Sequence, residues 1–284
     1  ARHPLWPDDG TGEGTGAIVP ILDEAFSLGM RPGNKGFWLC LTSDAEARAE
    51  GAPTSFEAEL TPWWGPPSTL TYRNNVYGFG MGYDILRLQG TKLILKVDGE
   101  EFEGTAYFQK VSVQAPTFPW FWGMLHFDDG SYIDWFKPHA TLGMTSMDDR
   151  PWRRRDFFRN PAIGIGIFHD ANRVRTENFK RCEVEVSEPD GEESLRDEQG
   201  NILPKFRIRI WNGRTQVSID VRACSRARWT FDQPTRAGMV SHLTYNEYPL
   251  EVERIAILDE QGLRTIDDYE WIMGNAEHTW GVLH

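Results

Sequence analysis

The sequence has few cysteines, no long apolar run and fewer basic than acidic side chains. Cys40, Cys182 and Cys224 are the three cysteines of the 284 residues, and their wide spacing predicts neither a disulfide framework nor a Cys-x-x-Cys metal site. The apolar runs are interrupted by Pro or Gly well before the ~20 residues that a membrane-spanning helix needs. Lys and Arg number 30 against 42 Asp and Glu, a net charge of −12. This charge argues against nucleic acid or an anionic membrane as a partner.

Familiar catalytic and cofactor motifs are also missing. The chain has no His-Glu-x-x-His sequence, no nucleophile elbow, no phosphate-binding loop and no Cys/His metal spacing. We therefore expect neither a cofactor nor a bound metal, unless ligands distant in sequence converge on one. Residues 1–7 have no apolar core of a signal peptide, and no Asn-x-Ser/Thr sequon occurs. Together with the scarce cysteines, these features indicate a cytoplasmic, reduced protein.

Segments with the character of β-strands recur between clusters of Gly, Pro, Asn and Asp. In 205–210 and 217–222, apolar residues take every second place, which puts one face of each strand on a core. Asp98-Gly99 and Asp129-Gly130 suit tight hairpin turns, because both offer residues that tolerate a positive φ. Short helices are expected only at Ala17–Leu28 and Thr265–Asn275, so the predicted class is mainly β. The expected strands are Gly36–Leu41, Ser55–Leu60, Leu93–Val97, Thr105–Val113, Trp122–Phe127, Tyr132–Phe136, Cys182–Val186, Lys205–Trp211, Gln216–Ala223, Arg228–Phe231, Leu243–Tyr248 and Glu251–Leu258.

Two related halves are indicated by strands that carry Tyr followed, two places on, by a polar residue. Tyr107 and Gln109 form the first such pair, and Tyr245 and Glu247 form the second. An aromatic strand opens each half, but the offsets differ, so the halves are not a strict repeat. Two antiparallel β-barrels that meet near residue 115 fit this pattern best, and two sandwiches are the alternative.

These segments resemble a known group of proteins. Phe121–Ser131, with the sequence FWGMLHFDDGS, is similar to the aromatic strand and Asp-Asp-Gly turn of the carotenoid 1,2-hydratase and AttH-like superfamily. Gly104–Gln109 and Thr244–Glu247 resemble that superfamily's paired Tyr-x-acid strands. The superfamily also includes tocopherol cyclase-like proteins, kievitone hydratase and lipocalin-like Diels–Alderases. Gln109 stands where many relatives carry Asp or Glu, and an amide cannot protonate an alkene.

The resemblance implies two lipocalin-like (calycin) antiparallel β-barrels in tandem, with few short helices. We expect an N-terminal lead-in over 1–29, a first barrel over 30–114 and a second barrel over 115–284. The second barrel would contain an inserted Arg-rich loop around 150–159 and a C-terminal extension.

Acid catalysis on an apolar substrate requires a carboxyl group that stays protonated near neutral pH, and an apolar setting supplies this by desolvation. Tyr245 and Glu247 lie two residues apart on a strand and therefore share a face. We expect Glu247 to be the acid, with its pKa raised above the ~4.3 of a free Glu. The alternative is that these are satisfied polar side chains without a catalytic role.

His126 and Asp134 are the second candidate pair, because a turn at Asp129-Gly130 would bring their strands together. A structural hydrogen-bonded pair is the alternative interpretation. Trp122 and Trp38, with Tyr107 and Gln109, are expected to bind the substrate, although aromatic residues also fill ordinary cores.

The sequence thus predicts a cofactor-independent enzyme that binds a hydrophobic isoprenoid, polyene or polyketide-like molecule in a β-barrel pocket. The expected reaction is hydration, dehydration or cyclisation, which makes the protein a hydratase (a lyase) or a cyclase. A pericyclase is included, because such a reaction needs no acid. The alternative function is a non-catalytic carrier or sensor of a hydrophobic small molecule.

Overall fold

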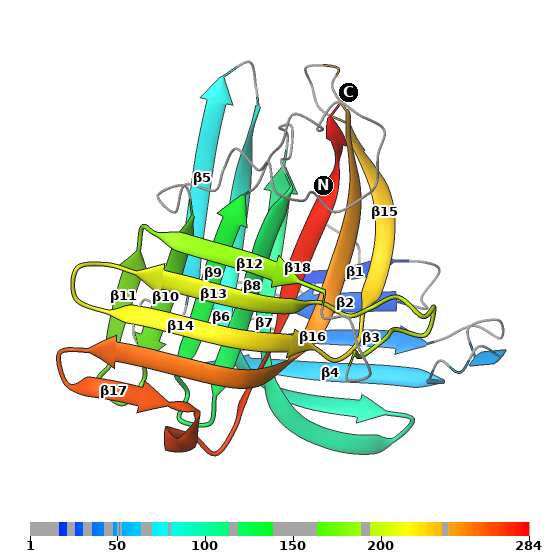
Figure 1. Ribbon diagram of the computed structural model, residues 1–284. Helices are drawn as coiled ribbons and strands as arrows, with labels where there is room; N and C mark the ends of the chain where they lie inside the picture. The colour runs from blue at the N-terminus through cyan, green and yellow to red at the C-terminus, as the bar shows by residue number, and fades with distance from the viewer. Residues whose placement is uncertain are drawn as a thin grey trace, which may run out of the picture. The chain divides into compact units, whose positions relative to one another are not determined.

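The structure is a computed structural model of the chain (Figure 1). It describes residues 17–21, 26–30, 36–42, 48–49, 51, 53–63, 70–78, 81–113, 119–138, 164–188, 194–234, 238 and 240–283. Two compact units, 1–73 with 85–111 and 74–84 with 112–284, are described separately below. The Arg-rich loop around 150–159 and most of the predicted lead-in lie outside the described residues. The predicted barrel limits at 30–114 and 115–284 stay a prediction.

The first sheet has seven antiparallel strands. Its order is β1-β2-β3-β4-β6-β5, and β7 pairs with β6. Both central residues of the β6–β7 turn, Asp98 and Gly99, have positive φ, as the sequence predicts for a tight hairpin. The strands are β1 (Ala17–Ile21), β2 (Phe26–Met30), β3 (Phe37–Thr42), β4 (Ser55–Pro62), β5 (Leu70–Gly78), β6 (Met81–Val97) and β7 (Glu100–Val113).

The second sheet has eleven strands, in the order β11-β10-β9-β8-β18-β16-β14-β13-β12, with β15 and β17 also paired to β16. The long strand β16 pairs with four strands of this sheet. Its first half lies between β15 and β18, and its second half pairs with β14 and β17. The strands are β8 (Trp120–Phe127), β9 (Tyr132–Pro138), β10 (Ile165–Asp170), β11 (Arg175–Phe179), β12 (Cys182–Ser187), β13 (Lys205–Trp211), β14 (Gln216–Ala223), β15 (Ala227–Pro234), β16 (Val240–Asp259), β17 (Gly262–Thr265) and β18 (Ile272–Leu283).

One apolar core joins most strands of the eleven-stranded sheet. The sheet curls so that β12, β13 and β14 lie across β8, β9 and β10 (Figure 1). A Cβ atom on Gly166 of β10 would lie only 2.9 Å from the Ile210 side chain of β13, which shows how closely the two sides approach. The core is built largely from alternate residues along these strands, among them Leu125, Ile133, Ile208, Ile219 and Tyr248.

The mainly β class predicted from the sequence is confirmed, and the two large sheets fit a tandem arrangement of barrels. Both alternating segments form strands with the predicted bounds, β13 and β14. The segments 243–248 and 251–258 are parts of the single strand β16, with a register shift opposite Asp220 and Val221. Within the described residues, no helix is long and apolar enough to cross a membrane.

The two predicted helices are wrong. Ala17–Leu28 contributes to β1 and β2, and Gly29 is not a helix cap: a Cβ there would lie 2.3 Å from the Trp38 ring. Thr265–Asn275 contains the last residue of β17, the 3-10 turn η6 (Ile266–Asp268) and the start of β18. Ile266, Tyr269 and Ile272 imitate helical spacing because this turn lets all three pack against the core.

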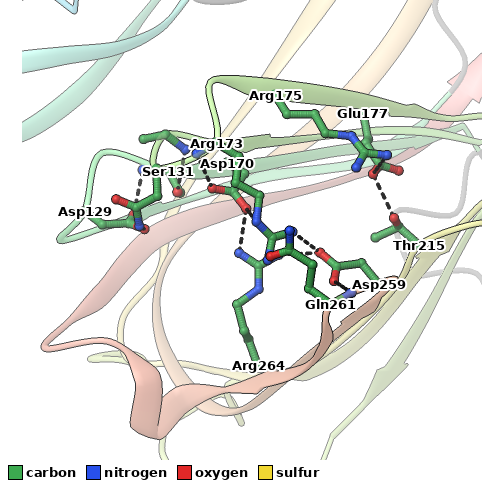
Figure 2. Close-up of polar contacts among 12 residues, drawn as sticks. Asp129, Ser131, Asp170, Arg173, Arg175, Glu177, Thr215, Asp259, Gln261 and Arg264 are labelled. Atoms are coloured by element: carbon green, nitrogen blue, oxygen red, sulfur yellow. Dashed lines mark hydrogen bonds and ion pairs between the residues drawn. The ribbon is translucent and has the colours of Figure 1, made fainter.

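A ring of alternating charges joins β10, β16 and β17 (Figure 2). Asp170 and Asp259 each contact both Arg173 and Arg264. The Arg264 Nη1 and Nη2 atoms lie 2.7 and 2.9 Å from the Asp170 and Asp259 carboxylates. Both carboxylates are nearly buried, and each has two guanidinium partners. Opposite charges that satisfy one another in this way indicate a structural role, and we expect the ring to stabilise this part of unit 2.

Candidate functional site

The Tyr-x-Glu pair lies on β16, on the face of the sheet opposite the apolar core. Tyr248 and Leu250 belong to that core, and side chains alternate along a strand, so Tyr245 and Glu247 point the other way. The β-barrel pocket that the sequence predicts for this pair stays a prediction. Both residues are half-buried.

Two glutamates face each other across neighbouring strands. Glu247 of β16 pairs directly with Glu277 of β18 on one side and with Ala227 of β15 on the other. Side chains of directly paired residues lie on the same face, with Cβ atoms about 5 Å apart. Glu277 is only 6% exposed. The register therefore places two carboxyl groups side by side in a largely buried setting.

Polar neighbours hold each carboxyl group in place. The Asn275 side-chain amide donates a hydrogen bond to Glu247 Oε1, and the Tyr245 hydroxyl also hydrogen-bonds to this carboxyl group. The Trp120 indole N–H donates to Glu277 Oε2 at 2.8 Å. Each glutamate thus has its own hydrogen-bond donors, and these hold the two carboxyl groups in defined positions beside each other.

The environment favours the protonated form of Glu247. Burial, and next the charge of Glu277, raise the pKa of Glu247 from 4.5 to about 7. The hydrogen bonds from Asn275 and Tyr245 act in the opposite direction but are outweighed. This is the direction that the sequence predicts for an acid catalyst, and it leaves a substantial protonated fraction near neutral pH.

Aromatic rings surround Tyr245. The Trp229 ring of β15 stacks on the Tyr245 ring, with centroids 4.3 Å apart and planes 20° from parallel. Trp120 of β8 meets the same tyrosine edge-on at 5.8 Å. Trp229 is 46% exposed, so part of its ring is open to solvent. The carboxyl pair therefore lies beside a wall of three aromatic side chains.

The His126 and Asp134 pair lies on the same face of the sheet, further along it. The predicted hairpin at Asp129-Gly130 forms, and both side chains are buried. Asp134 accepts a hydrogen bond from the Trp122 indole N–H at 3.2 Å, and Trp122 pairs directly with Glu277. The structure thus brings Trp122 next to both the glutamate pair and Asp134. The catalytic roles predicted for His126 and Asp134 stay a prediction.

Tyr107, Gln109 and Trp38 belong to unit 1. Phe37 stacks on Phe108 with ring centroids 4.4 Å apart, and each candidate is a strand neighbour of one of these rings. Because side chains alternate, all three candidates lie on the face opposite the Phe37–Phe108 stack. The side-chain oxygen Oε1 of Gln109 accepts a hydrogen bond from Arg87 Nε at 2.6 Å. The substrate-binding role of this group stays a prediction.

Sequence reasoning missed four residues of the site: Trp120, Trp229, Asn275 and Glu277. The last two lie on β18, for which no strand was expected. Only the alternation of Ala276, His278 and Trp280 with polar residues hints at it. Among the described residues, no group of three His, Cys, Asp or Glu side chains is placed to hold a metal ion. The site offers carboxyl, phenol, amide and indole groups.

No protein-family model matches the chain, and neither does any curated protein sequence. Several solved structures are similar to it, among them the following two. One is a protein from Nitrosomonas europaea assigned as AttH, with 11% identity and a TM-score of 0.39, covering 93% of this chain and 86% of the other. The second is kievitone hydratase from Nectria haematococca, with 10% identity and a TM-score of 0.36, covering 94% and 85%. Both bear names from the superfamily that the sequence motifs resemble.

Proposed function

We propose that this protein is a cofactor-independent hydro-lyase that adds water to, or removes it from, a hydrophobic small molecule such as an isoprenoid, polyene or polyketide. Glu247 is the general acid. The observation that carries the proposal is a carboxyl group whose pKa is raised to about 7, beside a phenol and a second carboxylate. A group with this pKa can both give and take a proton near neutral pH.

The hydration step uses Glu247 twice, first as an acid and then as a base. The Glu247 carboxyl proton is transferred to one carbon of the alkene, whose π electrons form the new C–H bond and leave a cation on the neighbouring carbon. The Glu277 carboxylate lies next to this cation and stabilises it electrostatically. The oxygen of a water molecule then bonds to the cationic carbon, and the proton that it loses returns to Glu247. Dehydration is the same sequence reversed.

Tyr245 holds the acid in position. Its hydroxyl hydrogen-bonds to the Glu247 carboxyl group, and its ring is fixed between Trp229 and Trp120. Orientation of this kind matters because proton transfer to carbon requires the acid to point at one atom. If an alkene of the same substrate captured the cation before water, the product would be a ring, and cyclisation would follow from the same first step.

The proposal is tested by incubating the protein with hydrophobic extracts in oxygen-18-labelled water and analysing the products by mass spectrometry. Hydration adds one labelled water, dehydration removes one water, and cyclisation leaves the mass unchanged. Glu247→Gln should lower turnover by at least about 100-fold, as expected for a lost general acid. A protein that binds an extract component but converts none of it is a carrier, and this outcome would refute the enzymatic proposal.

A further inference from the structure

The two sides of Glu247 differ in how open they are. Toward β18 it faces Glu277, which is only 6% exposed and is held by the Trp120 indole. Toward β15 it faces Ala227, an exposed residue whose side chain is a single methyl group. Within the described sheet, β15 pairs only with β16, so this side ends at a sheet edge. The side toward Ala227 is therefore the more open side of the Glu247 carboxyl group.

A flat aromatic surface flanks this approach. Trp229 is two residues from Ala227 on β15, hence on the same face of the strand. One side of its indole stacks on Tyr245 at 4.3 Å, and the ring is 46% exposed. Indole surfaces bind planar conjugated rings better than flexible chains, because stacking needs two flat partners in parallel or edge-on contact.

The charge of the site restricts the substrate further. The Glu277 carboxylate already lies beside Glu247, so an anionic substrate would be repelled by it. A cationic substrate would be attracted, but it would stabilise the ionised form of Glu247 and so remove the proton that the reaction needs. Only an uncharged substrate leaves the protonated acid unaffected.

We propose that the substrate is an uncharged molecule with a planar conjugated ring system, which lies over Ala227 against the open part of the Trp229 indole and presents its reacting carbon to Glu247. This inference rests on the proposed function for the role of Glu247. It narrows the substrate class, because an open-chain isoprenoid has no ring to place on Trp229.

Three probes separate the elements of the proposal. β-Naphthol is planar and neutral at neutral pH, β-naphthoate has the same rings with a negative charge, and geraniol is neutral but flexible. We expect β-naphthol to bind about tenfold more tightly than either of the others, as measured by calorimetric titration at pH 7. If geraniol or β-naphthoate binds as tightly as β-naphthol, or if none of the three binds, the proposed substrate class is wrong.

Variants on β15 locate the binding position. Trp229→Ala removes the stacking surface and Ala227→Leu fills the approach to Glu247, and each should weaken β-naphthol binding about tenfold. Thr230→Leu adds bulk to the same strand but on its opposite face, and should leave binding unchanged. Equal affinities for wild type, Trp229→Ala and Ala227→Leu would overturn the inference.

A fourth variant separates this inference from the proposed function. Glu247→Gln should keep β-naphthol affinity within about twofold, because the amide has nearly the shape of the carboxyl group, while turnover is lost. If binding depends on Trp229 but Glu247→Gln leaves turnover intact, the substrate position stands and the acid role fails. If Glu247→Gln abolishes turnover and Trp229→Ala leaves affinity unchanged, the acid role stands and the substrate position fails.

Discussion

Replacement of Glu247 by Gln should make the protein more stable at neutral and alkaline pH. In the unfolded chain this carboxyl group ionises near its ordinary pKa of 4.5, whereas in the folded protein it does so at about 7. Between these values the folded state holds a proton that the unfolded state has lost, so folding stability declines as pH rises. Below pH 4.5 the two states are equally protonated and no penalty exists. Above about pH 7 the full penalty is present.

The size of the effect follows from the pKa difference. A pKa raised from 4.5 to about 7 corresponds to about 3 kcal/mol, at about 1.4 kcal/mol for each pKa unit. Glutamine carries no charge, so the variant lacks this penalty, and its amide oxygen can still accept the hydrogen bond from Asn275. We expect the Gln variant to match wild type near pH 4 and to exceed it by about 2 to 3 kcal/mol near pH 8.

Urea unfolding of both proteins at a series of pH values measures this difference directly. Glu270→Gln is the matched control, because Glu270 is an exposed carboxyl group outside the site, and it should not alter the pH profile. A Gln variant that is less stable than wild type near pH 8, with an unchanged pH slope, would show that Glu247 is an ionised structural partner. The acid role would then fail as well.

Three further variants test neighbouring parts of the argument. Glu277→Gln removes the like charge, so the pKa of Glu247 should fall from about 7 toward 4.5. Carbon-13 NMR of the Glu247 carboxyl group follows this pKa. An unchanged value would show that burial alone raises it. Asp170→Asn breaks the ring of charges and should lower the free energy of unfolding by about 3 kcal/mol, because Arg264 loses a buried partner. Urea unfolding measures this loss, and a loss below about 1 kcal/mol would contradict the argument. Gly274→Ala puts a Cβ 1.9 Å from the Met124 backbone oxygen and should cost at least about 2 kcal/mol, whereas an unchanged melting temperature would show that β8 and β18 adjust freely.

Local patterns in the sequence were enough to predict much of the eleven-stranded sheet. Strict alternation marked β13 and β14, because one face of each contacts the core and the other water. The Asp-Gly turns marked two hairpins, since few other residues adopt the required φ. β18 was missed because it lies between β8 and β16 and its middle part is buried on both faces. Polar residues such as Glu277 and His278 therefore occur on both faces, and the sequence lacks a strict alternation of polar and apolar residues.

The site was only half predictable for a related reason. Tyr245 and Glu247 could be placed on one face because they are two residues apart on one strand. Glu277 lies 30 positions further on, and only the register between β16 and β18 brings it beside Glu247. No local pattern encodes that register. The same holds for Ala227 and Trp229, whose importance depends on which β16 residues they face.

The two charged clusters of unit 2 follow opposite physical rules, and the contrast supports a functional role for one of them. In the ring of Asp170, Arg173, Asp259 and Arg264 each charge has neighbours of opposite sign, so that removal of any one partner would leave a buried charge partly uncompensated. Glu247 and Glu277 instead place like charges together in a buried setting, and this arrangement costs stability above about pH 7. The ring contains arginines that compensate its carboxylates, whereas at the glutamate pair burial, and next the charge of Glu277, raise the pKa of Glu247. Unfavourable arrangements are expected where chemistry requires them, and the cost carried by the glutamate pair is the observation on which the proposed acid role of Glu247 rests.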